Sequence, residues 1–134
     1  MSRTALSVYI YGLYYVSMIA PPFLVFPHFA LDLFGLSAGE GIWVRYVGVL
    51  TGTIGAIYIA GVLTRTTQLY IWTVPARYVS GFFLALMVML GEAGLALMLF
   101  AALDVLTASI TWVAIRADAA EAEEVAKAEE IAAD

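Results

Sequence analysis

Long runs of apolar residues dominate the pattern of hydrophobic and polar positions along the chain. The runs cover residues 5–26, 42–63, 69–90 and 93–115; the first contains no charged residue, and each of the others contains one. Each run exceeds the roughly 18 residues that mark a membrane-spanning helix. The pattern predicts an all-α fold, a four-transmembrane-helix bundle of antiparallel up-down topology that occupies residues 1–116.

Prolines complicate the end of the first predicted helix. Pro21 and Pro22 lack the N–H group that a helix interior needs, so this helix should either stop near Ala20 or kink there. If it stops, residues 23–36 would form a short interfacial segment along the membrane face, and residues 37–41 would form a loop that leads into the second helix.

We do not expect the first run to be a cleaved signal peptide, because only Arg3 precedes it and no small-residue cleavage site follows.

The composition supports a membrane protein and separates a tail from the bundle. Hydrophobic residues make up 63% of the chain and charged residues 13%, against about a quarter charged in average soluble proteins. Residues 116–134 hold seven of the eleven acids and two of the six bases, a net charge of −5, and the four acids and four bases before them cancel. Residues 117–134 are therefore predicted to form an acidic, Ala/Glu-rich cytoplasmic tail that is helical and solvated.

The same composition excludes several classes of function. The chain has no basic patch, so we expect no nucleic-acid partner. It has no cysteine, which excludes disulfides, iron–sulfur clusters and thiolate zinc sites. A single histidine excludes a haem held by two histidines. We expect no cofactor and no metal.

Positive charges between the runs predict the orientation. Arg3, Arg65 and Arg116 would lie on one side, and the loops on the other side carry no Lys or Arg. By the positive-inside rule both termini are cytoplasmic, in a protein integral to the cell (inner) membrane. Trp43 would then lie at the outer interface, and Trp72 and Trp112 at the inner one, as in an aromatic belt.

Small residues form a ridge on the second predicted helix. Gly48, Gly52, Ala56 and Ala60 recur at intervals of four, which allows another helix backbone to approach closely. The ridge predicts either packing inside the bundle or the seam of a homo-oligomer, and the sequence leaves both alternatives open.

Two of the three charged residues in the apolar runs lie well inside them. Arg77 and Asp104 each lie on a helix face made of small and polar residues, Ser80 among them, so both should point into the bundle. We predict that they form a buried ion pair, which either fixes the register of the helices or acts in a proton relay or ligand site. Tyr11 and Tyr15 share one face of the first helix and would add hydroxyl groups to this intramembrane polar site.

A second polar cluster is predicted at the outer interface. It consists of Arg45, Glu92, His28 and Asp32. His28 and Asp32 are four residues apart and share a face if that segment is helical. The cluster is interpreted as a wet interface, with a metal site or a lipid-modifying enzyme as the sharper alternatives.

Three short motifs carry a resemblance to a known family. They are Trp43-Val44-Arg45-Tyr46, Thr73-Val74-Pro75-Ala76-Arg77 and Ala101-Ala102-Leu103-Asp104. With these motifs, residues 5–115 resemble the DoxX-like group of small bacterial four-helix membrane proteins, some of which are accessory subunits of oxidoreductase systems. Small multidrug-resistance carriers are similar in size, but they place a glutamate in the first helix, where this chain has no acid.

Two hypotheses of function follow. The first is a small non-catalytic membrane protein, an accessory or self-associating helical module whose partners are the lipid bilayer and either a second copy or another membrane protein. The second is a proton-linked carrier or binding protein for a small lipophilic solute that uses Arg77 and Asp104. We favour the first at this stage.

Overall fold

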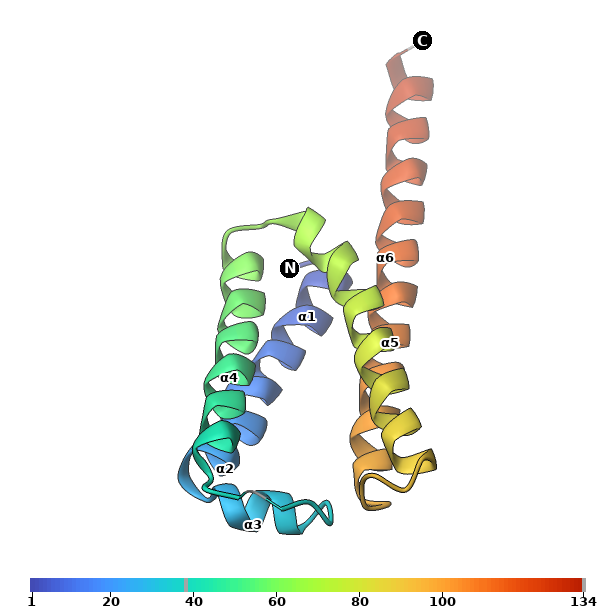
Figure 1. Ribbon diagram of the computed structural model, residues 1–134. Coiled ribbons are helices and arrows are strands. Elements are labelled where there is room, and N and C mark those ends of the chain that lie inside the picture. The colour runs from blue at the N-terminus through green and yellow to red at the C-terminus, as the bar shows by residue number, and fades with distance from the viewer. Residues whose placement is uncertain (38, 134) are drawn as a thin grey trace.

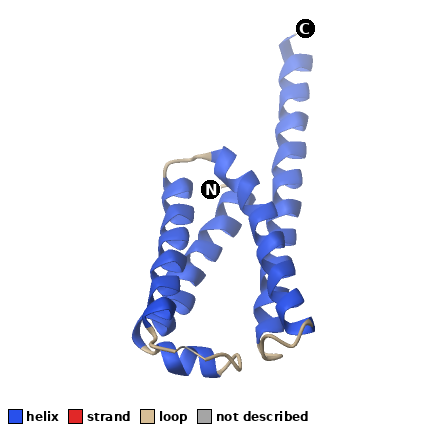
Figure 2. Ribbon diagram, viewed as in Figure 1, coloured by secondary structure: helices blue, strands red, loops and turns tan. Residues whose placement is uncertain are grey.

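The computed structural model describes residues 1–37 and 39–133, which form helices and no strand (Figure 2). Ala38, in the predicted loop, and Asp134, at the end of the predicted tail, lie outside the described residues. In chain order the elements are α1 (Arg3–Tyr14), a π-helical turn η1 (Tyr15–Ile19), α2 (Ala20–Val25), α3 (Pro27–Asp32), α4 (Ile42–Leu63), α5 (Thr67–Met89) and α6 (Leu97–Ala133). Because α1, η1 and α2 are continuous, the described chain has four helices long and apolar enough to cross a membrane, which confirms the all-α, four-span prediction.

The first span continues past its prolines. Pro21 and Pro22 cannot donate to the carbonyl groups four residues before them, so an ordinary α-helix would lose two hydrogen bonds here. One turn earlier the helix widens, and the N–H of Ala20 donates to the carbonyl of Tyr15, five residues back. The prolines then occupy the first turn of α2, where no N–H donor is required. The alternative in which the helix stops at Ala20 is wrong, since the helix continues to Val25.

The spans associate as two pairs. One pair joins α1 and α2 to α4, and the other joins α5 to α6; α1 also packs on α6, whereas α4 and α5 make little contact. Figure 1 shows the pairs close together near the N-terminus and further apart near α3. We call the half that contains the N-terminus and the α4–α5 connection the closed half, and the half that contains α3 and the α5–α6 turn the open half.

Side-chain burial follows this division. The largest side chains that are fully buried are Val8, Thr73, Arg77 and Thr111. All four lie in the closed half, where α1, α5 and α6 meet. The most completely buried large side chains are therefore at this end of the bundle.

The segment after α2 crosses the open end. Figure 1 shows α3 lying across the bundle, between the foot of α4 and the α5–α6 turn. The N–H of Gly94 in that turn donates to the carbonyl oxygen of Phe34 at 2.6 Å, and the Phe34 ring meets Phe100 edge to face with centroids 5.1 Å apart. A Cβ atom on residue 94 would lie 2.5 Å from the Phe34 oxygen, so this contact requires glycine. The segment thereby ties the two helix pairs together at the end where they diverge.

The outer surface of the bundle is apolar. Large hydrophobic side chains are exposed on every span, among them Ile10, Ile57, Phe82 and Leu106. A surface of this kind would associate in water, but it matches the hydrocarbon chains of a bilayer. The protein is thus a small integral membrane protein. Past the start of α1, α6 leaves the bundle and projects as a single helix to Ala133 (Figure 1).

Candidate functional site

Arg77 lies at the centre of the closed half with only 2% of its surface exposed. Its Nε donates to the carbonyl of Thr73 at 3.1 Å, and its Nη2 donates to the hydroxyl oxygens of Thr73 at 2.8 Å and Thr111 at 3.0 Å. Thr73 is one turn earlier on α5, and Thr111 comes from α6. Hydroxyl and carbonyl oxygens from two helices therefore replace part of the water that a guanidinium loses on burial, whereas Nη1 has no hydrogen-bond partner among the described residues.

Tyr11 of α1 lies between Arg77 and Asp104. The guanidinium carbon of Arg77 is 4.3 Å from the centroid of the Tyr11 ring, within cation–π range. The Tyr11 hydroxyl donates to Oδ1 of Asp104. Arg77 and Asp104 are both described, and they form no ion pair within 4.0 Å. The prediction of a direct ion pair between Arg77 and Asp104 is therefore wrong. The side chain of Tyr11 lies between the two charged groups and contacts both.

Side-chain direction explains this difference. In an α-helix the Cα–Cβ bond tilts toward the N-terminus of its own helix. Helix α5 begins at the closed end and α6 begins at the open end (Figure 1), so Arg77 leans toward the closed end and Asp104 toward the open end. The backbones approach closely at this level, since a Cβ atom on Gly81 would be 2.9 Å from the carbonyl of Ala101. The charges therefore diverge although their helices touch.

Further tyrosines extend the polar site. The hydroxyl groups of Tyr11 and Tyr15 are 2.9 Å apart, as predicted for neighbours on one helix face. Tyr58 of α4 stacks on both rings, with centroid distances of 6.1 Å to Tyr11 and 6.5 Å to Tyr15. Sequence reasoning did not single out Tyr58. The signal in the sequence is a tyrosine about one turn after Gly55, at which α1 and α4 pack closely.

A cavity of about 820 Å³ occupies the open half. This volume lies within the range of about 300–1,000 Å³ that small-molecule sites have. Every span contributes to its wall, and Leu31, Phe34 and Leu36 of the crossing segment cover its outer end. Asp104, Tyr15 and Ser80, all singled out from the sequence, line it together.

The inner end of the cavity is polar on all four spans. On each span the lining residue furthest from the open end is polar: Tyr15 and its neighbour Tyr14 on the first, Thr51 on α4, Ser80 on α5 and Asp104 on α6. The lining residues toward the open end are mainly apolar; they are Ile19, Phe23, Val44, Val47, Phe83, Leu84, Met87, Leu97 and Phe100. The site thus has a polar floor and apolar walls.

One side of the cavity faces the surroundings between α4 and α5. Trp43 and Val47 of α4 and Phe83 of α5 line the cavity, yet 74%, 48% and 54% of their respective surfaces are exposed. These helices make little contact with each other. In a bilayer this side would open toward the lipid chains.

The small-residue ridge of α4 divides into two parts. Gly48 and Gly52 face the first span, and a Cβ atom on either would lie within 3.3 Å of Ala20 or its neighbours. Ala56 and Ala60 are exposed. The closest crossing uses Gly55, which the ridge did not include: a Cβ atom there would be 2.8 Å from the carbonyl of Gly12 on α1. Within the bundle, therefore, Gly48 and Gly52 of the ridge pack against another span and Ala56 and Ala60 do not.

The predicted outer polar cluster does not form a bonded group. Arg45 donates through Nη1 to the carbonyl of Leu24 at 2.6 Å, which ties α4 to α2. His28, Asp32 and Glu92 are exposed, and among the described residues none of the four takes part in an ion pair. Within residues 1–37 and 39–133, no three histidine or carboxylate side chains lie close enough to hold a metal ion.

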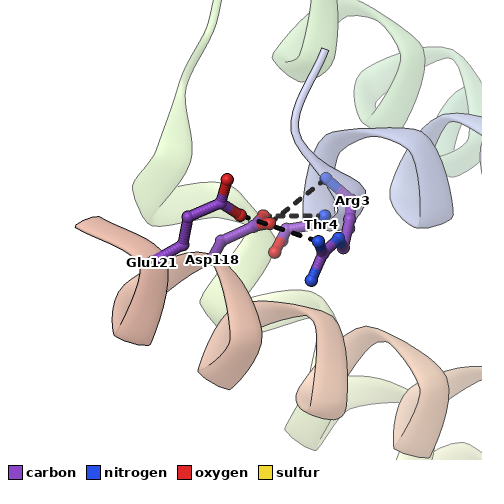
Figure 3. Close-up of polar contacts among 4 residues, drawn as sticks. All are labelled: Arg3, Thr4, Asp118 and Glu121. Atoms are coloured by element: carbon purple, nitrogen blue, oxygen red, sulfur yellow. Dashed lines mark hydrogen bonds and ion pairs between the residues drawn. The ribbon is translucent and has the colours of Figure 1, made fainter. Parts of the chain in front are cut away.

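A polar contact that the sequence did not indicate joins the start of α1 to α6. Asp118 accepts hydrogen bonds from the backbone N–H groups of Thr4 at 3.0 Å and Arg3 at 3.4 Å, and the Arg3 guanidinium is 3.7 Å from Glu121 (Figure 3). Asp118 lies beyond the apolar part of α6. The N–H groups of the first turn of α1 have no partner within the helix, and a carboxylate is a favourable acceptor there. The Thr4 N–H in particular holds the pKa of the Asp118 carboxyl below its usual value.

Comparisons with protein-family models, with curated proteins and with solved structures give no match to this chain. The resemblance to the DoxX-like group therefore stays a prediction from three short motifs. The function must be inferred from the geometry of the cavity and of the polar residues at its floor.

Proposed function

We propose that this membrane protein is a non-catalytic binding module that holds a lipophilic molecule in the cavity of its open half. The observation that carries the proposal is a volume of about 820 Å³ with apolar walls, a polar floor and a side that faces lipid. Binding sites for small molecules have this combination of an apolar lining and a few directed polar groups. An accessory role in a larger membrane system is compatible with such a module, because a bound molecule can be passed to a neighbouring protein.

Under this proposal the protein lies in the cell membrane with both termini in the cytoplasm. Arg3, Arg65 and Arg116 support this orientation, since Arg3 begins α1, Arg65 lies in the α4–α5 connection, and Arg116 lies two residues before Asp118, which bonds to the start of α1. The four spans then cross in an antiparallel, up-down order, α3 lies at the outer interface, and the acidic end of α6 extends into the cytoplasm. A reporter enzyme that works only in the cytoplasm should be active when it is fused after the last residue. A reporter that works only outside the cytoplasm should be inactive at this position, and its activity would contradict the orientation.

The binding proposal is tested by filling the cavity. Ser80→Phe places a ring at the floor, and the matched control Val79→Phe adds the same ring one position away, where Val79 is 69% exposed and does not line the cavity. Each protein is purified from native membranes, and lipophilic molecules are extracted and identified by mass spectrometry. We expect a molecule that co-purifies with the wild type and with Val79→Phe but not with Ser80→Phe. Identical extracts from all three proteins would contradict the proposal.

A proton-linked carrier is the second candidate, and one observation favours it. Asp104 is a titratable group that lines the cavity and is hydrogen-bonded to Tyr11, whose hydroxyl adjoins that of Tyr15. Carboxylates inside membrane spans are commonly part of proton relays. Uptake of a cavity ligand into proteoliposomes should then respond to a pH gradient in the wild type and lose this response in Asp104→Asn. Uptake that responds neither to the pH gradient nor to the Asp104→Asn substitution would contradict the carrier function and leave only the binding role.

Self-association through α4 is a separate proposal about partners. The exposed half of the small-residue ridge, Ala56 and Ala60, leaves room for a second helix to approach. The mass of the protein in detergent, compared between the wild type and Ala60→Phe, tests this proposal. A wild type that is strictly monomeric would refute it.

A further inference from the structure

The floor of the cavity offers hydrogen-bond acceptors to a ligand. Asp104 accepts through Oδ1 from Tyr11, and among the described residues its other oxygen, Oδ2, accepts no hydrogen bond. The Tyr11 hydroxyl is also placed to donate to the Tyr15 oxygen at 2.9 Å, but its single proton can serve only one acceptor at a time. A ligand head group that reaches Oδ2 of the Asp104 carboxylate can bond to it only by donating a hydrogen bond.

The charges around the floor are already balanced. Among the described lining residues, Asp104 is the one charged side chain at the inner end, and the guanidinium of Arg77 lies over the ring of Tyr11, whose hydroxyl donates to Asp104. The other charged residue of that lining, Glu92, is exposed at the α5–α6 turn. A cationic or anionic head group at the floor would add an uncompensated charge in an apolar region, which is costly. The head group is therefore uncharged.

The walls and the lateral side define the rest of the ligand. From Thr51 at the floor to Trp43 near the mouth, α4 rises by eight residues, or about 12 Å. Apolar side chains line this length, and the gap between α4 and α5 gives it a side toward lipid. A linear hydrocarbon chain fits such a volume, with its far end close to Trp43.

We infer that the ligand is an uncharged, long-chain lipophile whose head group donates a hydrogen bond to Asp104, as a primary alcohol does. This inference rests on the proposed binding function and specifies the chemistry of its ligand. The head group lies at the floor, among Asp104, Tyr15 and Ser80, and the chain extends toward Trp43. Asp104 thus sets the specificity for hydroxyl over carbonyl head groups.

The position of Trp43 supplies a direct test. Trp72 and Trp112 lie on another face of the bundle and do not line the cavity. The double variant Trp72→Phe/Trp112→Phe leaves Trp43 as the sole tryptophan, and 12-bromododecan-1-ol carries a fluorescence quencher at the end that should reach it. The protein is held in lipid nanodiscs, and quenching of Trp43 is measured at increasing mole fractions of the probe. Trp43→Phe, with its two remaining tryptophans, measures quenching by probe that is merely dissolved in the lipid.

Competition then ranks head groups at constant chain length. Dodecan-1-ol, dodecan-2-one, dodecylamine, dodecanoic acid and dodecane are each titrated against the bromine-labelled alcohol. We expect dodecan-1-ol to compete about tenfold or more better than the ketone and the alkane, because a hydrogen bond to a charged group is lost in both. The amine and the acid should also compete more weakly, owing to their charge.

The outcomes separate the inference from the function on which it rests. Saturable quenching with the expected order supports both. Saturable quenching that all five compounds reverse equally, or that the ketone, amine or acid reverses best, overturns the inference and leaves the binding function in place. No saturable quenching of Trp43 above that seen with Trp43→Phe overturns both.

A variant at the floor checks the role of Asp104 itself. Asp104→Asn replaces one acceptor oxygen by an N–H donor at nearly constant size, so the preference for alcohol over ketone should fall by about tenfold, toward equal binding. Asp32→Asn makes the same change at an exposed carboxylate that does not line the cavity, and it should keep the preference. An unchanged preference in a folded Asp104→Asn protein would show that the carboxylate does not contact the head group. If Asp104→Asn does not fold, the order in which the five compounds compete for the wild-type protein still tests the inference.

Discussion

The closed and open halves of the bundle are built from the same helices, yet they use their polar residues in opposite ways. In the closed half, Arg77, Thr73 and Thr111 bond to one another and fill the interior. In the open half, Asp104 and Ser80 border a volume of about 820 Å³ instead. Polar groups that are bonded to each other stabilise the helix contacts, whereas polar groups that border a cavity are available to a ligand. Tyr11 belongs to both halves, because its ring contacts Arg77 and its hydroxyl contacts Asp104.

Glycines and aromatic residues produce this difference in packing. Gly12 and Gly55 allow α1 and α4 to touch in the closed half, and Gly81 does the same for α5 and α6 at the boundary. In the open half, bulky side chains such as Phe23 and Phe100 stand on the facing helices and line the cavity. The crossing segment closes the end of the open half without filling it.

The largest expected effect comes from removing a charge at the junction of the halves. Arg77→Leu leaves Asp104 without its compensating charge, and we expect it to lower the free energy of unfolding by about 3–5 kcal/mol, by soluble-protein precedent. The double variant Arg77→Leu/Asp104→Leu should lose less than the sum of the two single variants, because it removes both charges. Unfolding in mixed detergent micelles measures all three proteins. Additive losses would mean that the two charges are independent.

The variant Tyr11→Phe tests whether the energetic coupling between Arg77 and Asp104 passes through the hydroxyl of Tyr11. The variant keeps the ring beside Arg77 but removes the hydroxyl that donates to Asp104, so on its own it should cost about 1–3 kcal/mol. It should also reduce the coupling between Arg77 and Asp104. Coupling of the same size in the Tyr11→Phe background would show that the tyrosine hydroxyl does not transmit it.

The next effect tests the close packing of the closed half. Gly55→Val places a branched side chain where even a Cβ atom would lie 2.8 Å from the carbonyl of Gly12, and we expect a loss of about 1–3 kcal/mol from overpacking. Ala56→Val is the matched control, since Ala56 is exposed on the next position of the same helix. The same unfolding assay measures both variants, and equal stabilities would contradict the close crossing.

The spans were predictable from sequence because a long apolar helix is a local property. The predicted run 42–63 coincides with α4, and the run 69–90 differs from α5 by two residues at its start and one at its end. The end of the first span was harder to predict, because a pair of prolines can either stop a helix or be accommodated within it. A π-helical turn before Pro21 depends on backbone geometry, and no residue pattern reports it directly.

The sequence predicted which residues contribute to the polar site, but it did not predict which of them contact one another. Charges inside apolar runs identified Arg77 and Asp104, and helical spacing identified Tyr11, Tyr15 and Ser80. Their mutual arrangement depends on which way each helix runs and on a third helix that contributes Tyr11. The cavity could not be read from the sequence at all, because it arises from the divergence of two helix pairs.

A smaller effect concerns the far end of the closed half, where Asp118 accepts from Thr4. The pKa of this carboxyl is lowered in the folded protein, so its stabilising contribution is present at neutral pH. It is lost as the pH falls below about 3.9, the usual value for aspartate, and through the lower pKa of the folded state. Asp118 is solvent-accessible, so the contribution should be below about 1 kcal/mol. Asp118→Asn should remove this part of the pH dependence, measured as the thermal midpoint between pH 3 and pH 7, and an unchanged pH profile would contradict it.

The smallest effect should come from the projecting end of α6. Deleting residues 119–134 keeps Asp118 and its bond to Thr4, and it removes residues that are exposed throughout their described part. The deletion also breaks the ion pair of Arg3 with Glu121 at 3.7 Å, in which both side chains are about two-thirds exposed. Exposed pairs of this kind contribute little and are screened by salt, so the free energy of unfolding should change by less than about 0.5 kcal/mol. Saturable quenching of Trp43 by 12-bromododecan-1-ol should also be unchanged, because the cavity lies in the opposite half. A large fall in the thermal midpoint in detergent, or a weaker response of Trp43, would show that this end of α6 acts on the bundle and that the two halves are not independent.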